Sequence, residues 1–260
     1  MYYYRIIISY NGTHYCGWQD LGKNSDVPTI QAQIQRVLQK ICKYQECTVS
    51  VASRTDAGVH AQGQVAKITI ALSIEEEKLL LGMNSLLADD IRILQCEVCS
   101  SEFNANKHST SKEYHYYFST QTIHNPVMHD VVAHIPSLSK GLSLLDIKCI
   151  KEACKLFVGE HDFYNFAKRD KTMHSTVRRL ISCEIVEVQD SVFSKKVYYI
   201  KVVGNGFLRY MVRYIAGALF GVGRKEISLS DIANALANKQ EQKISRIAKA
   251  RGLHLIKIFY

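Results

Sequence analysis

Strand-like and helix-like patterns alternate along the first hundred residues, and this alternation restricts the fold more than any other feature. Residues 2–10 are rich in Tyr and Ile, which favour β-strands, and they end at the turn signal Asn11-Gly12. Apolar residues recur at helical spacing over 30–41, after Thr29. Further strand-like runs lie at 47–54, 63–72 and 91–99, and a second helical pattern lies at 74–87, with a capping box at Ser73 and Glu76. The first half of the chain therefore predicts one α/β unit.

A polar stretch, residues 100–111, separates this unit from a second half with a roughly similar order of elements. Strands are predicted there near 112–119, 130–134, 179–189, 196–203 and 253–259, and helices near 144–158, 206–221 and 229–238. The economical architecture is two α/β units with antiparallel or mixed sheets, packed or joined around a cleft.

The charge balance of the chain indicates a polyanionic partner. Its 260 residues include 33 Lys and Arg against 24 Asp and Glu, a formal net charge of +9. A basic surface attracts nucleic acid, although the same excess can serve solubility alone. No run of about 18 uncharged apolar residues occurs, so we expect a soluble protein with no membrane partner.

The eight cysteines lie scattered in apolar segments of a chain without a signal-peptide pattern, which predicts reduced thiols in a cytosol. Cys96 and Cys99 have the spacing of a metal or redox knuckle, but no second pair or histidine follows at a suitable distance. We interpret them as small buried residues of a strand, and expect neither a metal nor a cofactor.

One octapeptide, residues 53–60, places a carboxylate directly after a strand-like run. Its sequence is Ser-Arg-Thr-Asp-Ala-Gly-Val-His, so Gly58 allows a turn after Asp56. In an extended chain Arg54 and Asp56 project from one face, and the guanidinium would keep the carboxylate ionised. This pattern suits a nucleophile or base, and it also suits an ordinary surface turn with an Arg/Asp pair.

The octapeptide and the run Tyr10-Asn-Gly-Thr-His-Tyr-Cys-Gly-Trp-Gln19 resemble the opening motifs of the TruA-type tRNA pseudouridine synthases. Further blocks resemble that family in the same order: Asn84 with Asp89-Asp90-Ile91, Phe103-Asn-Ala105, Lys112-Glu-Tyr-His-Tyr116, Gly159-Glu-His-Asp-Phe163, Phe207-Leu-Arg-Tyr-Met-Val-Arg213 and Ala248-Lys-Ala-Arg-Gly-Leu-His-Leu255. The resemblance covers nearly the whole chain. It implies two RRM-like (ferredoxin-like) units around a basic catalytic cleft, with residues 1–107 carrying the catalytic Asp and 108–260 carrying the active-site Tyr and Arg.

By this resemblance Asp56 is the catalytic nucleophile, Tyr114 the aromatic residue on the target base, and Arg213 the cation that pairs with the carboxylate. The reaction supports these roles, because moving the base from an N1 to a C5 linkage at ribose C1′ needs a carboxylate beside C1′ and no redox cofactor. On a strand, Tyr114 shares a face with Lys112 and Tyr116, which also suits plain packing. On a helix, Arg213 lies one turn after Arg209.

Extruding a uridine from a stem needs contacts that hold the RNA. The residues that we expect to contact substrate RNA are Arg54, Tyr114, Phe103, Asn106, Lys107, Lys168, Arg169, Lys171 and Arg209. Four positions depart from the family pattern: Asn11 replaces a usual Asp, Ser53 a Gly, Ala88 a Pro, and Asn106 an Arg that commonly touches RNA.

The sequence therefore predicts a cytoplasmic isomerase that forms pseudouridine in the tRNA anticodon stem-loop, and the resemblance implies positions about 38–40 and a homodimer. A non-catalytic RNA-binding protein of the same fold is the first alternative, and a hydrolase using Asp56 with His60 is the second. A non-catalytic RNA-binding protein would be expected to lose Asp56, Tyr114 or Arg213, and all three are present. A hydrolase would need an oxyanion or metal partner, which the sequence lacks.

Overall fold

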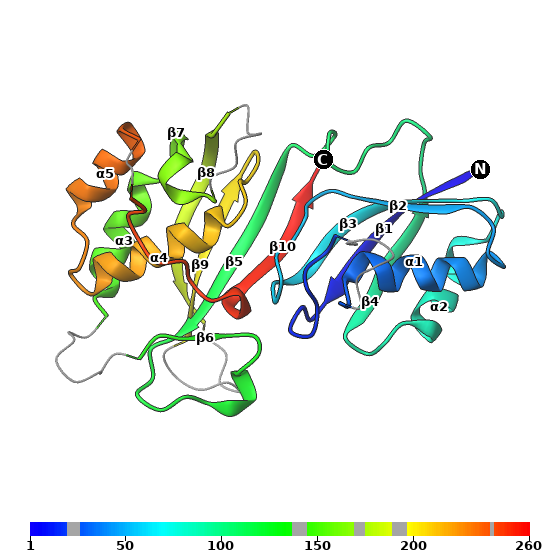
Figure 1. The fold of residues 1–260 in the computed structure, drawn as a ribbon, viewed down its shortest axis with the longest axis horizontal. Helices are drawn as coiled ribbons and strands as arrows, with labels where there is room; N and C mark the ends of the chain where they lie inside the picture. The colour runs from blue at the N-terminus through cyan, green and yellow to red at the C-terminus, as the bar shows by residue number, and fades with distance from the viewer. Residues whose placement is uncertain (20–26, 137–144, 169–174, 189–196, 240–241) are drawn as a thin grey trace. The chain divides into compact units, whose positions relative to one another are not determined.

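The computed structural model describes residues 1–19, 27–136, 145–168, 175–188, 197–239 and 242–260. The chain forms two compact units. Unit 1 comprises Met1–Thr110 with Leu255–Tyr260, and unit 2 comprises Ser111–His254. Both combine helices with a sheet, so the predicted α/β class is confirmed in this coarse form (Figure 1).

Unit 1 is a sheet packed against two helices (Figure 1). Its elements are β1 (Tyr2–Tyr10), α1 (Ile30–Ile41), β2 (Cys47–Val51), β3 (His60–Ile70), α2 (Glu76–Leu86) and β4 (Ile91–Val98), and it includes β10 (Leu253–Phe259) from Leu255 onward. Strand β1 lies between β4 and β3 and is antiparallel to both, while β2 and β10 pair with β3.

Local sequence explains most of these boundaries. Alternate residues of β1 are buried from Tyr4 to Tyr10, as a strand with one covered face requires. Helix α1 begins where predicted, because the Thr29 side chain accepts a hydrogen bond from Ala32 N at 3.3 Å. The predicted cap of the second helix is wrong: Glu75 is its N-cap and makes no side-chain capping bond.

Unit 2 combines strands with three helices. Its elements are β5 (Ser111–Ser119), β6 (Ala133–His134), α3 (Ile147–Leu156), β7 (Gly159–Asp162), β8 (Val177–Glu187), β9 (Val197–Gly204), α4 (Met211–Gly223) and α5 (Leu229–Ala237), with short 3₁₀ turns at Pro126–Met128, Phe163–Phe166 and Ala250–Gly252. Within the unit the strand order is β5-β9-β8-β7 with antiparallel pairs, and β6 pairs parallel with β5, so the pairing is mixed.

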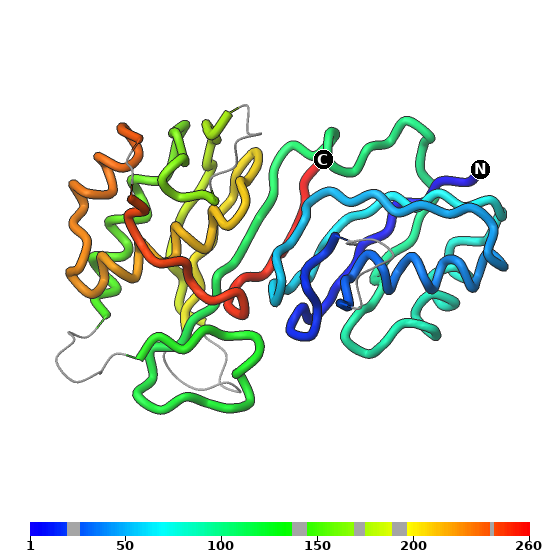
Figure 2. The backbone as a smooth tube through the Cα atoms, in the orientation of Figure 1, coloured from blue at the N-terminus to red at the C-terminus, as the bar shows by residue number. Residues whose placement is uncertain are grey.

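The end of the chain returns to unit 1 (Figure 2). Thr110 N donates to Phe259 O at 2.8 Å, and Tyr260 Oη donates to Ala105 O at 2.8 Å. The compact units thus differ from the predicted halves, 1–107 and 108–260, by three residues at the junction and by the segment 255–260. The difference arises because residues 255–259 pair with a strand of unit 1.

All eight cysteines are free thiols, and Cys96 and Cys99 are half-buried rather than buried. Among the described residues, no cluster of three or more His, Cys, Asp or Glu side chains has the arrangement of a metal site. In the same part of the chain, no helix has the length and apolarity needed to cross a membrane.

Candidate functional site

The Asp56 loop, residues 52–59 between β2 and β3, is tied to the segment that follows β1. Trp18 N donates to Thr55 O at 3.1 Å, and Gly58 N donates to Tyr15 O at 3.1 Å. Gly58 has φ 73°, so the predicted turn with positive φ is present. Two backbone hydrogen bonds therefore hold the chain on either side of the half-buried Asp56.

Glycine 17 lets these two segments approach each other. It has φ 92°, and a Cβ atom there would lie 2.5 Å from Thr55 O. Side chains add to the contact, since Tyr10 Oη hydrogen-bonds Thr55 Oγ1 at 2.8 Å and Gln64 Nε2 donates to Ser53 O at 2.6 Å. Burial raises the pKa of Tyr10 to about 12, which keeps its hydroxyl neutral. The loop is thus fixed through both backbone and side chains.

His60 contributes to this anchoring rather than to a metal site. Gly12 N donates to His60 Nδ1 at 3.1 Å, so in the neutral imidazole the proton is on Nε2. Arg54 is exposed on the same loop, and the predicted Arg54/Asp56 partnership stays a prediction.

A second loop of unit 1 carries three predicted RNA contacts. The Asn104 side chain accepts hydrogen bonds from Asn106 N at 3.1 Å and Lys107 N at 2.9 Å, and both of these residues are exposed. The Phe103 ring packs on the Tyr260 ring, with centroids 5.4 Å apart. The Asn104 turn therefore presents Asn106 and Lys107 to solvent.

In unit 2, Lys112, Tyr114 and Tyr116 lie on the buried face of β5, as the alternating pattern predicted. Tyr114 is 5% exposed and meets the Phe207 ring edge-to-face at 5.0 Å. Tyr116 Oη donates to Lys249 O at 2.9 Å. Burial lowers the pKa of Lys112 from 10.5 to about 8. A buried ammonium two residues from Tyr114 marks this face as a candidate site.

Arg213 and Arg209 do not share a helical face, contrary to the prediction of a helix over 206–221. Helix α4 begins at Met211, because Tyr210 has φ 65° and ψ 5°. A non-glycine residue in this left-handed region costs about 1–2 kcal/mol. Arg213 Nε donates to Ala248 O at 2.8 Å, which fixes one edge of its guanidinium.

The Tyr210 ring nevertheless brings three of the predicted cations together. The Cζ atoms of Arg209 and Arg213 lie 5.0 and 5.1 Å from its centroid, and Lys168 Nζ lies at 5.9 Å. Sequence reasoning did not select Tyr210. The only signal was an aromatic residue inside a run that otherwise resembles a helix.

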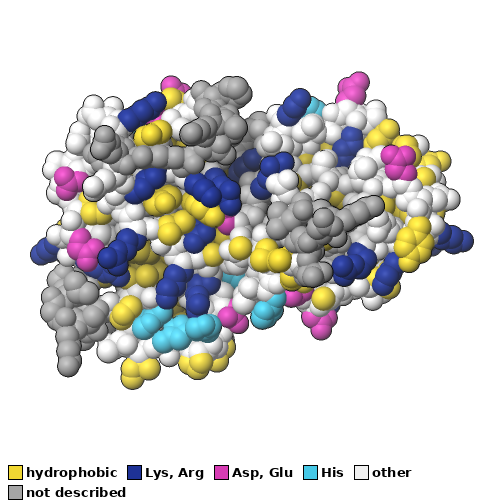
Figure 3. Space-filling model, in the orientation of Figure 1, with side chains coloured by type: hydrophobic (Ala, Val, Ile, Leu, Met, Phe, Trp, Pro, Cys, Tyr) yellow, Lys and Arg dark blue, Asp and Glu magenta, His cyan; other side chains and the backbone are white. Residues whose placement is uncertain are grey.

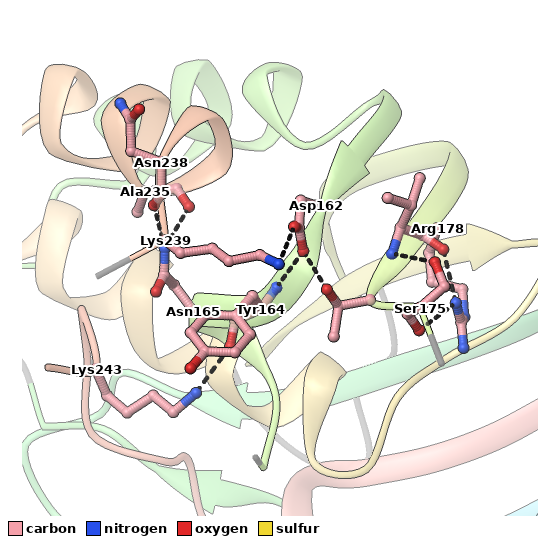
Figure 4. A network of polar contacts seen from close by, with 11 residues as sticks. Asp162, Tyr164, Asn165, Ser175, Arg178, Ala235, Asn238, Lys239 and Lys243 are labelled. Atoms are coloured by element: carbon pink, nitrogen blue, oxygen red, sulfur yellow. Dashed lines mark hydrogen bonds and ion pairs between the residues drawn. The ribbon is translucent and has the colours of Figure 1, made fainter. Parts of the chain in front are cut away.

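A polar network fixes the segment that leads to Lys168 (Figure 4). Asn165, 1% exposed, donates to Ala235 O and Asn238 O, both at 2.7 Å. Lys243 Nζ donates to Tyr164 O at 2.8 Å. Lys168 follows this anchored stretch, whereas Arg169 and Lys171 lie outside the described residues.

Histidine side chains gather on one face of unit 2 (Figure 3). Arg251 Nη1 lies 2.7 Å from His129 Nε2, and His129 Nδ1 lies 2.9 Å from His124 Nε2. Because arginine can only donate, His129 accepts at Nε2 and donates from Nδ1, so this chain of hydrogen bonds needs both histidines neutral.

The chain matches the family model described as tRNA pseudouridine synthase over residues 6–100 and 153–260, and it belongs to this family of isomerases. It is 48% identical to tRNA pseudouridine synthase A 2 of Desulfotalea psychrophila, covering 99% of this chain and 98% of that protein. It is 36% identical to tRNA pseudouridine synthase A of Bacillus pumilus and of Ruminiclostridium cellulolyticum, covering 98% of each chain in both cases. The chain is therefore a tRNA pseudouridine synthase of the TruA type.

A chain of the solved Cbf5–Nop10–Gar1 complex is similar over 97% of this chain and 48% of its own length. With 12% identity and a TM-score of 0.34, this likeness supports no further statement.

Proposed function

We propose that the protein forms pseudouridine in the anticodon stem-loop of tRNA, at positions about 38–40, with Asp56 as its catalytic carboxylate. The family supplies the reaction class. The observation that supports the residue is the Asp56 loop, which hydrogen bonds from Trp18 N and Gly58 N hold on both sides. A carboxylate on such a loop meets its substrate with little reorganisation.

The reaction breaks the bond between ribose C1′ and N1, rotates the base, and joins C1′ to C5. The hydrogen on C5 is released and N1 gains a proton, so the product is an isomer and no electrons are exchanged. Ionised Asp56 either attacks C1′ or removes a ribose proton. Both routes require a nearby cation to keep the carboxylate charged, and we assign this role to Arg213.

Tyr114 is proposed to contact the target base and to relay the C5 proton through its hydroxyl. Further RNA contacts are assigned to Arg54, Phe103, Asn106, Lys107, Lys168, Arg169, Lys171 and Arg209. The exposure of Arg54, Asn106, Lys107, Lys168 and Arg209 supports this assignment. Asn106 stands where the family pattern has Arg, so we expect a weaker contact at that position.

The finer architecture is part of the same proposal. Two RRM-like halves, 1–107 with Asp56 and 108–260 with Tyr114 and Arg213, would form a basic catalytic cleft. The element order βαββαβ of unit 1 supports the RRM-like assignment. We further propose a cytoplasmic homodimer that binds tRNA and needs no cofactor.

Asp56→Asn tests the proposal, because it removes the reacting oxygen and keeps the shape of the side chain. Pseudouridine formation is followed by the release of tritium from C5 of labelled uridine in a tRNA transcript. We expect the rate to fall by at least about a thousandfold while tRNA affinity is largely kept. Asp130→Asn, at an exposed aspartate of unit 2, is the matched control. An Asp56→Asn enzyme with substantial activity would remove Asp56 from the reaction.

The same experiment separates the alternative of a non-catalytic RNA-binding protein. Wild-type protein that binds tRNA and releases no tritium would favour that alternative. The presence of Asp56, Tyr114 and Arg213 together argues against it.

A further inference from the structure

Tyr210 has a backbone conformation that is unfavourable for its own side chain. Its φ of 65° and ψ of 5° lie in the left-handed region, and it makes no side-chain capping bond to α4. Glycine or asparagine would adopt this conformation at lower cost. A bulky residue at such a position therefore indicates a favourable contact that a smaller residue cannot make, and strained residues of this kind cluster at functional sites.

The ring supplies that contact, because three cations lie over it. Arg209 Cζ, Arg213 Cζ and Lys168 Nζ lie 5.0, 5.1 and 5.9 Å from the ring centroid. Cations within about 6 Å of an aromatic face are attracted to it. The half-buried ring thus offsets its backbone cost by holding three side chains from two parts of unit 2.

Hydrogen bonds fix the arrangement of these cations. Lys168 N donates to Arg209 O at 2.9 Å, so the two chain segments run side by side. Arg209 Nη2 donates to Tyr210 Oη at 3.3 Å, and Arg213 Nε donates to Ala248 O at 2.8 Å. The network around Asn165 and Lys243 anchors the Lys168 segment from its other end (Figure 4).

Such a cluster suits an anion with several oxygen acceptors. Lys168 and Arg209 are exposed, so their charged groups reach solvent. A phosphate group fits, since guanidinium and ammonium groups are its usual donors.

We propose that Tyr210 assembles a binding site for an RNA backbone phosphate from Lys168 and Arg209, and that it positions the guanidinium of Arg213 beside that site. The identity of the anion as RNA phosphate rests on the proposed function. Tyr210 acts through the three cations and is therefore a positioning residue. Through it, binding of a phosphate is coupled to the placement of the cation that Asp56 needs.

Tyr210→Gly removes the ring and at the same time relieves the backbone strain, so any loss of function reports the contacts of the ring and not the strain. We expect a folded protein whose affinity for an unmodified tRNA transcript depends less steeply on salt. The slope of log affinity against log salt should fall by about 0.7–0.9, the value of one phosphate contact. At saturating RNA, the single-turnover rate should drop at least about tenfold, because Arg213 loses its placement. Tyr210→Phe keeps the ring, so its salt slope and its single-turnover rate should both stay close to the wild-type values.

Tyr44→Gly is the matched control. Tyr44 has φ 62°, close to the φ of Tyr210, but it is 79% exposed on unit 1. This change relieves the same strain and should leave the salt slope and the turnover rate at wild-type values. Arg209→Gln gives an independent test, since it should reproduce the change in slope with the ring in place.

An unchanged salt slope in both Tyr210→Gly and Arg209→Gln would overturn the phosphate site. A normal single-turnover rate in Tyr210→Gly would overturn the positioning of Arg213. Equal defects in Tyr210→Phe and Tyr210→Gly would assign the effect to the hydroxyl and contradict the role of the ring. Wild-type protein that binds tRNA but forms no pseudouridine would refute the proposed function, while the comparison of slopes would still decide the phosphate site.

Discussion

At neutral pH, Lys112→Met should be more stable than the wild type, and at high pH this advantage should disappear. The Lys112 side chain is buried on β5, and the loss of water around its ammonium lowers its pKa from 10.5 to about 8. At about 1.36 kcal/mol for each pKa unit, this difference corresponds to about 3 kcal/mol of folding free energy. Methionine has a similar length and carries no charge, so it avoids this cost.

The sign of the pH dependence follows from the two protonation states. Below pH 8 the amine is charged in both the folded and the unfolded chain, so the full cost of burying the charge is present. Between pH 8 and 10.5 the unfolded chain binds more protons than the folded one, so wild-type stability rises with pH. The difference between Lys112→Met and wild type should therefore shrink by about 3 kcal/mol across this range.

Urea unfolding at pH 7 and pH 10, followed by far-UV circular dichroism, measures this difference. Fluorescence of the single tryptophan, Trp18, reports on unit 1, whereas Lys112 belongs to unit 2. Lys148→Met, at an exposed position of α3, is the control and should show one stability difference at both pH values. If Lys112→Met also differs from the wild type by the same amount at pH 7 and pH 10, burial of the ammonium costs no folding free energy and the prediction is wrong. We also expect the stabilised variant to isomerise uridine more slowly, since costly buried charges are kept at functional sites.

Three other outcomes can be checked by equilibrium unfolding. Gly17→Ala should destabilise unit 1 by at least about 2 kcal/mol, because φ is 92° there and the new Cβ would lie 2.5 Å from a carbonyl oxygen; Trp18 fluorescence would report it. Asn165→Ala should cost about 2–4 kcal/mol in circular dichroism melts, since two carbonyl groups lose their donor, and a near-neutral variant would show that water replaces the amide. Burial, the neighbouring histidines and Arg251 lower the pKa of His124, so between pH 7 and 5 the unfolded chain binds a proton more readily than the folded chain. Acidification over this range should therefore lower the free energy of unfolding, and a wild-type protein whose stability stays constant would contradict this.

The elements that could be predicted from the sequence are those with a strong local signal. Alternation along residues 2–10 and helical spacing over 30–41 both reflect one buried face, and that face is visible in the order of apolar residues. The turn at Gly58 was predictable for a similar reason, because glycine adopts positive φ at little cost.

The elements that were missed depend on contacts distant in sequence. Strand β7 has only four residues and includes His161 and Asp162, so no apolar pattern marks it. Helix α4 begins after Tyr210, whose ring lies 5.9 Å from Nζ of Lys168, a residue from another segment. In the same way, nothing local in residues 255–260 indicates that they belong with the first unit rather than the second.

That last arrangement sets the order in which the protein can mature on the ribosome. Strand β3 can pair with β10 only late in synthesis, because β10 follows the other elements of unit 2 in the chain. Domains usually fold from the N-terminus as they emerge. Here the first unit to be made is completed only after the second, so the edge of β3 stays without this partner until β10 has been synthesised.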